Sequence, residues 1–137
     1  MDRLGVSVTP EQVGNINATS TRTLDALHQI KSDAFLMKEA VLRGDIGRVA
    51  DILNSSWLRK RQTADGVSNS AIDQVIARAL EVGALAGKVS GAGGGGFITF
   101  IVDPTRRLAL MRELEKFNGR AQSCSFTKHG TQGWRIE

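Results

Sequence analysis

The sequence predicts an α+β fold in which helices pack on one face of a small antiparallel sheet. Residues 24–80 carry apolar side chains at three- and four-residue spacing, which is the period of amphipathic helices. The period then changes, and Phe97–Val102 is a continuous β-branched and aromatic run typical of a buried strand. With 137 residues and 41% hydrophobic content, the chain fits one domain over 1–137 with a single core.

Three helices are expected before the sheet. Gly44 ends the first helix and Asp45 caps the second, while Ser70 with Asp73 forms an acidic capping-box pattern at the start of the third. Residues 62–68 are expected to form the loop between the second and third helices. The apolar stripes expected to face the core are, helix by helix, Leu24, Leu27, Ile30, Ala34, Met37 and Val41; Ile46, Val49, Leu53 and Trp57; and Ile72, Val75, Ile76, Ala79 and Leu80, up to Gly83.

The predicted sheet begins with Gly87–Ser90 and continues, after a glycine-rich connection, with Phe97–Val102. Asp103-Pro104 then opens a helix, because aspartate can cap it and proline lacks only an N–H that the first turn leaves unpaired. Asn118-Gly119 ends this helix, and Ala121–Phe126 is expected as a final strand. The apolar stripe of the helix consists of Leu108, Met111 and Leu114.

The most informative segment is Lys88–Phe97, KVSGAGGGGF, in which five of the six residues from Gly91 to Gly96 are glycine. Glycine adopts positive φ without steric cost, so this loop can gather its backbone amides around an anion such as a phosphate. The spacing matches the dinucleotide fingerprint, but that motif requires a helix after the loop, and a strand follows here. A Walker-type loop needs a lysine and a hydroxyl residue after its last glycine, where the chain has Phe97. A flexible linker is the remaining alternative, which the apolar segments on both sides disfavour.

A second candidate site lies at the end of the second helix, where Trp57, Lys60 and Arg61 are close enough to share one region of its surface. An indole can stack on a sugar, and the two cations can hold a phosphate, arginine as a bidentate pair. The alternative is that Trp57 closes the core at the helix end and the cations are solvated. Ser90 and Lys88, which precede the glycines, also leave alternatives open. Ser90 could bond a phosphate or cap the turn, and Lys88 could face a ligand or the solvent.

Composition narrows the classes of function. The excess of four positive charges and the pI near 9.7 suit an anionic partner such as a sugar phosphate, ATP or nucleic acid, although the dispersed charges equally fit a solvated basic surface. Cys124 is the only cysteine, which excludes an internal disulfide and fits a reducing cytoplasmic location. No apolar stretch suits a membrane span, and no signal peptide is visible. Neither His28 nor His129 has metal-ligand spacing to other residues, so no metal site is expected.

The glycine segment and its flanks resemble the third conserved motif of the GHMP kinases, the family of galactokinase, homoserine kinase and mevalonate kinase. The four-glycine form that follows Gly87-Lys88-Val89 is most similar to the bacterial D-glycero-D-manno-heptose 7-phosphate kinase branch of the family. The resemblance extends from about Gly5 to Ile136. Further residues that agree with this branch are Gly44-Asp45, Trp57 with Lys60 and Arg61, Ile72-Asp73, Gly83-Ala84, and the ending His129-Gly130-Thr131-Gln132-Gly133-Trp134-Arg135-Ile136.

This resemblance implies a ferredoxin-like C-terminal domain of a kinase that uses ATP and Mg²⁺. The expected substrate is a sugar phosphate, namely the anomeric hydroxyl of a heptose 7-phosphate, in a route to bacterial surface polysaccharide. The residues that the resemblance assigns are Ser90, Gly91, Ala92, Gly93, Gly94, Gly95 and Gly96 for the cofactor and Trp57, Lys60 and Arg61 for the substrate.

Family members also carry an N-terminal domain with the nucleotide-phosphate loop and the catalytic base, and no aspartate of this chain lies in a matching context. We therefore assign no catalytic residue and expect the chain alone to be inactive, either as an excised domain or as half of a split enzyme. Only Arg3–Val8 is left to supply an earlier central strand, so an open sheet edge could let copies associate. The alternative is a non-catalytic binding or oligomerisation module of the same fold. The lack of tyrosine and 5% aromatic content disfavour nucleic-acid binding.

Overall fold

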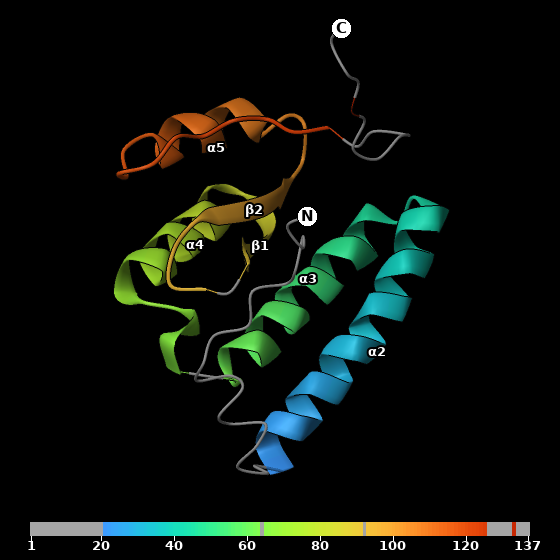
Figure 1. Cartoon of the computed structure of the whole chain (residues 1–137). Coiled ribbons are helices and arrows are strands. Elements are labelled where there is room, and N and C mark those ends of the chain that lie inside the picture. Colours follow the sequence, from blue (N-terminus) through green and yellow to red (C-terminus); the bar gives the residue numbers. More distant parts are fainter. Residues whose placement is uncertain (1–20, 64, 92, 126–132, 134–137) are drawn as a thin grey trace, which may run out of the picture.

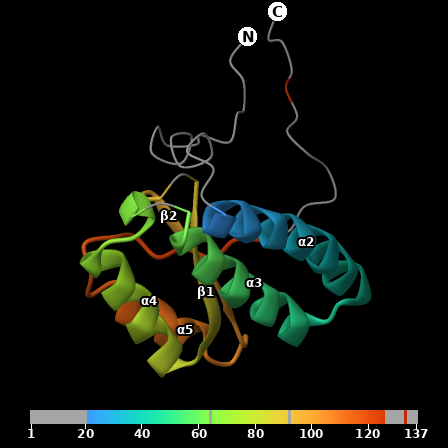
Figure 2. The same ribbon diagram turned by 90° about the horizontal axis from the view of Figure 1, so that it is seen from below.

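The computed structural model describes residues 21–63, 65–91, 93–125 and 133. In this part of the chain, helices surround a two-stranded antiparallel hairpin, so the predicted α+β class is confirmed (Figure 1). Two helices, α2 and α3, lie side by side, and a view from below shows α4 and α5 on the far side of the hairpin from α2 (Figure 2). The elements are α2 (Thr21–Arg43), α3 (Ile46–Arg61), the 3₁₀ turn η1 (Asp65–Val67), α4 (Ser70–Val82), β1 (Ala84–Ser90), β2 (Phe97–Val102) and α5 (Arg107–Leu114).

The helix ends follow local capping chemistry. Gly44 takes a φ of +68° after α2, and the Asp45 carboxylate accepts a hydrogen bond from the Arg48 amide at 2.9 Å, as expected for the cap of α3. The prediction for the start of α4 was wrong. Asn69 is the cap, since its side-chain oxygen accepts from the Ile72 amide at 3.0 Å, and the segment predicted as a Ser70 capping box begins one residue inside the helix.

The hairpin pairs Lys88 with Thr99 and Ser90 with Phe97, with a register irregularity near Ala84. The strand predicted at Phe97–Val102 is confirmed, and β1 begins three residues earlier than expected. Gly87 is required at its position, because a Cβ there would lie 2.7 Å from the Phe100 ring across the hairpin. The outer edge of β1 faces α3, where the Asn54 side chain donates to the Leu85 carbonyl at 2.9 Å.

The main core cluster joins α3, η1, α4 and the hairpin. Its buried members are Trp57, Val67, Ile72, Ile76 and Val89. Phe100 packs against this cluster and against a second one between α4 and α5, whereas the next residue, Ile101, packs against a third cluster between α2 and α3. Successive strand residues point to opposite faces, so helices contact both faces of the hairpin and not the single face that was expected.

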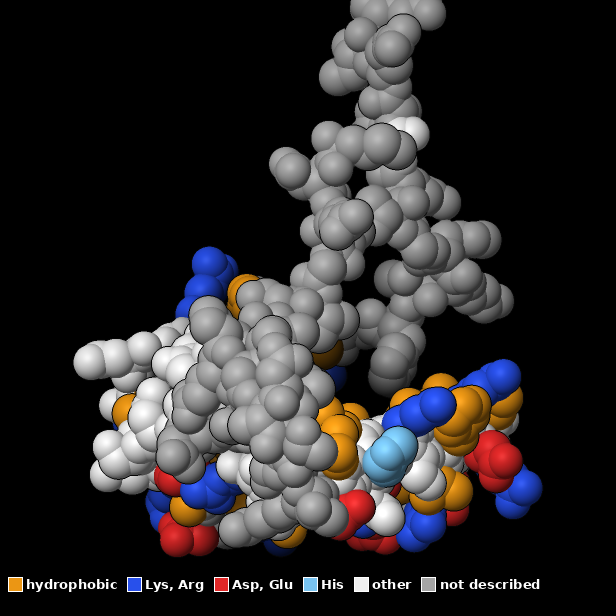
Figure 3. Space-filling view, turned by 60° about the horizontal axis from the view of Figure 1, so that its bottom comes forward, with side chains coloured by type: hydrophobic (Ala, Val, Ile, Leu, Met, Phe, Trp, Pro, Cys, Tyr) orange, Lys and Arg blue, Asp and Glu red, His pale blue; other side chains and the backbone are white. Residues whose placement is uncertain are grey.

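The buried face of α2 differs from the predicted stripe. Ala34 and Val41 are exposed, whereas Ala26, Asp33 and Ala40 are buried. The difference follows from the ion pair between Asp33 and Arg59 of α3, which turns a charged position of α2 toward its neighbour. Apolar side chains are consequently left on the outer surface, where hydrophobic and charged groups intermingle (Figure 3). The most exposed ones on α2 are Phe35 at 65% and Leu42 at 76%.

The C-terminal predictions need two corrections. The Asp103 carboxylate accepts from the Thr105 amide at 2.8 Å and closes a local turn, so α5 begins at Arg107, and it ends at Leu114, before the predicted stop. The described part of the predicted final strand, 121–125, is irregular and largely exposed, because AQSCS lacks the β-branched residues that favour strands. Phe126, the strand expected at Arg3–Val8 and the ending from His129 lie outside the described residues, apart from Gly133.

Candidate functional site

The glycine loop joins β1 to β2 and takes backbone conformations that side chains rarely adopt. The φ angles are +91° at Gly91, +113° at Gly93, +74° at Gly94 and +93° at Gly96. An L-residue at any of these four positions would be strained, which explains the glycines without reference to a ligand. The predicted cofactor residue Ala92 lies outside the described residues.

The inner half of the loop, Gly93 and Gly94, rests on η1. A Cβ at Gly93 would lie 2.6 Å from the Val67 carbonyl oxygen, closer than real Cβ atoms approach. The Gly94 amide donates to that same oxygen at 3.1 Å, and the Asn69 side chain donates to the Gly94 carbonyl at 3.3 Å. The loop is therefore docked on the connection between α3 and α4.

Lys60, on the last turn of α3, reaches the start of the loop. Its ammonium donates a hydrogen bond to the Gly91 carbonyl. Partial burial lowers the pKa of Lys60, and the charge of Lys88 lowers it further. The structure thus brings together two groups of residues that the sequence predicted separately, the glycine loop and one cation of the α3 cluster.

The outer half of the loop, Gly95 and Gly96, is open. Both residues are exposed, and a Cβ at either position would meet nothing within 4 Å. The next residue, Phe97, is 74% exposed. Ser90 lies beside the loop with its hydroxyl 3.1 Å from the Thr99 hydroxyl. Backbone groups of this half can be approached closely by a ligand, as a phosphate cradle requires.

Of the three residues predicted as a substrate site, Trp57 and Arg61 line one groove between α3 and α4, whereas Lys60 reaches the glycine loop. Trp57 is only 4% exposed and belongs to the main core, which agrees with its interpretation as a core residue. Arg61 forms a 2.9 Å ion pair with Asp73 of α4, whose other oxygen accepts from the Ser68 hydroxyl at 2.8 Å. This ion pair lies at a surface groove of about 410 Å³ between α3 and α4.

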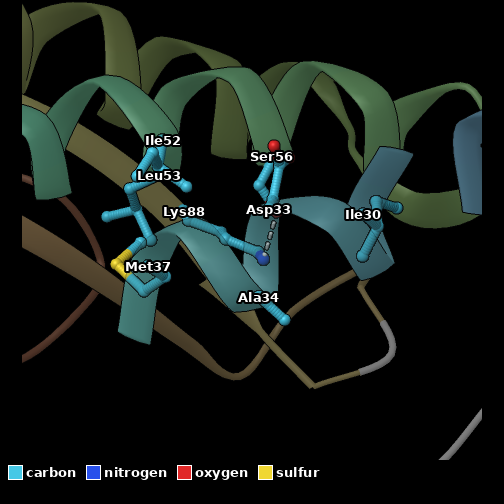
Figure 4. Close-up of a pocket in the computed structure, with 8 residues that line it drawn as sticks. All are labelled: Ile30, Asp33, Ala34, Met37, Ile52, Leu53, Ser56 and Lys88. Atoms are coloured by element: carbon cyan, nitrogen blue, oxygen red, sulfur yellow. Dashed lines mark hydrogen bonds between the residues drawn. The ribbon is translucent and has the colours of Figure 1, made fainter. Parts of the chain in front are cut away.

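Lys88 does not face the solvent as the sequence alternative proposed. It extends between α2 and α3 and donates to the Ser56 hydroxyl at 2.9 Å (Figure 4). Burial lowers the pKa of Lys88, an effect that the charge of Asp33 opposes. The surrounding cavity of about 160 Å³ is smaller than the roughly 300 Å³ at which small-molecule sites begin, and its charged groups already have partners. We interpret it as a packing gap between the helices.

Sequence reasoning missed the residues that support the loop from below. Val67 and Asn69 are the two that contact Gly93 and Gly94 directly. An asparagine directly before Ser70 at a helix start is a usable capping signal, and Val67 is an apolar residue within an otherwise polar connection. Neither signal indicates a contact with a loop that lies some 25 residues further along the chain.

Within 21–63, 65–91, 93–125 and 133, no three histidine, cysteine, aspartate or glutamate side chains gather into a group that could hold a metal ion. In the same ranges, none of the helices combines the length and apolar character needed to cross a membrane.

Residues 37–120, which include both halves of the loop and its supports, match the protein family described as “GHMP kinases C terminal”. The chain belongs to the GHMP kinase C-terminal family. The resemblance inferred from the glycine motif is therefore confirmed. This GHMP kinase C-terminal domain is 46% identical over 115 residues to a D-glycero-alpha-D-manno-heptose 7-phosphate kinase of Campylobacter jejuni, an alignment that covers 84% of this chain and 34% of that protein.

Solved structures give the same result for the GHMP kinase C-terminal domain. A sugar kinase from Campylobacter jejuni superposes with a TM-score of 0.61 and 47% identity, over 82% of this chain and 34% of that one. A D-glycero-D-manno-heptose 1-phosphate kinase from Bacteroides thetaiotaomicron gives a TM-score of 0.53 and 39% identity, over 71% and 27%. The chain spans about a third of the length of these relatives.

Proposed function

We propose that this GHMP kinase C-terminal domain forms one wall of the active site of an ATP-dependent kinase acting on the anomeric hydroxyl of a D-glycero-D-manno-heptose 7-phosphate. The observation that carries the proposal is the glycine loop, which is docked on η1 on one side and open on the other. The 46% identity to a heptose 7-phosphate kinase supports the substrate class.

The role proposed for the loop is to hold and orient phosphate. ATP, when bound, supplies the phosphoryl group that is transferred. Backbone at Gly95 and Gly96 can approach phosphate oxygens because no side chain intervenes, and catalysis of phosphoryl transfer consists largely of positioning and charge stabilisation. Ser90 can add a hydroxyl donor, because its oxygen can accept from Thr99 while its own hydrogen points to a ligand. Among the described residues, no three histidine, cysteine, aspartate or glutamate side chains gather into a metal-binding group, and we propose that Mg²⁺ is held mainly by another part of the enzyme.

The three proposed substrate residues have different surroundings, and we propose a different role for each. Arg61 is half-exposed at the end of α3 and can exchange its bond to Asp73 for a bidentate bond to a sugar phosphate. Trp57 contributes from the core, as the support beneath this end of the helix. Lys60 donates a hydrogen bond to the Gly91 carbonyl and so lies at the loop.

We propose that the catalytic base and the remaining nucleotide contacts come from a second domain, since neither was assigned to residues of this chain. Such an enzyme would work in the cytoplasm, where ATP is available, and would supply activated heptose for a bacterial surface polysaccharide. An exposed free cysteine, Cys124, is compatible with that reducing compartment.

A chimera tests the proposal. This chain would replace the matching third of the C. jejuni heptose 7-phosphate kinase, and ATP-dependent phosphorylation of heptose 7-phosphate would be measured beside the chain alone. We expect turnover by the chimera and none by the isolated chain.

The matched control is the same chimera carrying Gly95→Asp. Space is open around Gly95 and its φ is not positive, so the fold should tolerate the change, whereas a carboxylate beside the proposed phosphate position should abolish turnover. A folded chimera that phosphorylates no sugar phosphate would favour the alternative, a non-catalytic binding or oligomerisation module.

A further inference from the structure

Three supports from different elements converge on the glycine loop. The end of α3 supplies the Lys60 ammonium to the Gly91 carbonyl, and η1 supplies the Val67 carbonyl to the Gly94 amide. The cap of α4 supplies the Asn69 amide group to the Gly94 carbonyl. The two side-chain supports hold carbonyl oxygens, so they restrict the backbone without occupying the open half of the loop.

Lys60 is placed to hold the loop and not to reach across it. It belongs to the final turn of α3, whose negative dipole end favours a cation, and it is half-buried between α3 and the loop. Its ammonium group donates to the carbonyl of Gly91, the first glycine of the loop, and burial lowers its pKa.

We infer that Lys60 is a positioning residue: with Asn69 it fixes the conformation of the glycine loop in advance, so that Gly95 and Gly96 face a phosphate-bearing ligand without further ordering. The benefit of this order for phosphate binding rests on the proposed kinase function. The ordering of the loop by Lys60 does not, because it can be measured with no ligand present. The sequence predicted Lys60 as a residue that binds the sugar phosphate, and the bond to Gly91 gives it a role in the loop itself.

The experiment measures hydrogen exchange of the Gly94 amide, which donates to Val67, by NMR of this chain. The variants are Lys60→Met, which removes the donor, and Lys60→Arg, which retains one. Lys116→Met is the matched control, because the Lys116 ammonium pairs with Glu113, three residues before it in the chain, and not with the loop. Asn69→Asp is the second probe, since it keeps an oxygen to cap α4 and removes the donor to Gly94.

We expect Gly94 to exchange about five- to tenfold faster in Lys60→Met and in Asn69→Asp, as loss of one hydrogen bond predicts. Exchange should stay near the wild-type rate in Lys60→Arg and Lys116→Met, and core amides should be unaffected in all four. Unchanged Gly94 exchange in Lys60→Met, or equal acceleration of loop and core, would overturn the inference.

A second readout separates this inference from the kinase proposal. The same variants, placed in the chimera with the C. jejuni kinase, should show a raised KM for ATP in Lys60→Met and recovery in Lys60→Arg. A chimera without activity would count against the proposed function alone, and the exchange rates would still decide the role of Lys60. A Lys60→Met chimera with wild-type kinetics would contradict the positioning role.

Discussion

The inner and outer halves of the glycine loop consist of the same residue type for different physical reasons. Gly93 lies so close to Val67 that no Cβ fits, and Gly94 is hydrogen-bonded to the same residue. Gly95 and Gly96 have open space around them, and of these two only Gly96 has a positive φ, at +93°. Packing against Val67 therefore requires glycine in the inner half, whereas in the outer half only the backbone conformation of Gly96 requires it. Substitutions at Gly93 and Gly95 should separate a position that packing restricts from one that is open.

The largest loss of stability is expected from removing Trp57, which packs against Val67 beneath the inner half of the loop. Trp57→Ala should lower the free energy of unfolding by about 3–5 kcal/mol, because it empties the core that Trp57 shares with Val67. Chemical denaturation measures the loss. Leu58→Ala, one position along α3 and 59% exposed, is the control and should cost less than about 1 kcal/mol. Equal losses of stability in the two variants would show that the loop does not rest on the core cluster of Trp57 and Val67.

Gly93→Ala should cost about 2–3 kcal/mol, since φ is +113° and the new methyl group would meet the Val67 backbone. The identical change at Gly95 should alter stability by less than about 0.5 kcal/mol, because that site is open. The two variants are compared by thermal and denaturant unfolding. Similar stabilities for both would erase the distinction between the halves of the loop.

The burial of Lys88 predicts that the stability of the domain depends on pH. Burial lowers the pKa of Lys88 from its usual 10.5, so above the lowered value the unfolded chain binds more protons than the folded one. The contribution of Lys88 to the free energy of unfolding is therefore least favourable at neutral pH and rises toward pH 10.5. Denaturation of wild type and Lys88→Met across this range should show the wild type gaining relative to the variant. If the difference in free energy of unfolding between the two proteins stayed constant with pH, Lys88 would be solvated in the folded domain.

The smallest loss of stability is expected from changing Arg61, whose side chain lies at the surface. Arg61→Gln removes an ion pair to Asp73 in which both side chains are 41% exposed, so stability should fall by no more than about 1 kcal/mol. In the active chimera, the same variant should raise the KM for the sugar phosphate, whereas Lys60→Met should act on the KM for ATP. If both variants changed the same constant, the assignment of the two cations to different ligands would fail.

The sequence predicted those features that depend on neighbouring residues. Phe97–Val102 is a strand because its side chains are apolar and β-branched over its whole length, and Asp45 caps α3 through its own next turn. The buried face of α2 could not be predicted, because it depends on the pairing of Asp33 with Arg59, which lies 26 residues away. A periodicity argument treats a charged residue as solvent-facing, and here an ion pair overrides it.

The candidate site shows the same division. The positive-φ glycines were expected from composition, and the structure gives four of them. The contacts of Lys60, Val67 and Asn69 with the loop were not predicted, because they arise only after α3, η1 and α4 have packed around the core. Trp57 and Arg61 line one groove, as their helical spacing predicts, but the burial of Trp57 in the core was left open by the sequence.

The bond from Asn54 to the Leu85 carbonyl has a consequence for how the hairpin meets other chains. Exposed strand edges are templates for pairing, and proteins commonly obstruct them to avoid uncontrolled association. An amide side chain from α3 occupies an acceptor on the outer side of β1, so an incoming strand would have to displace it there.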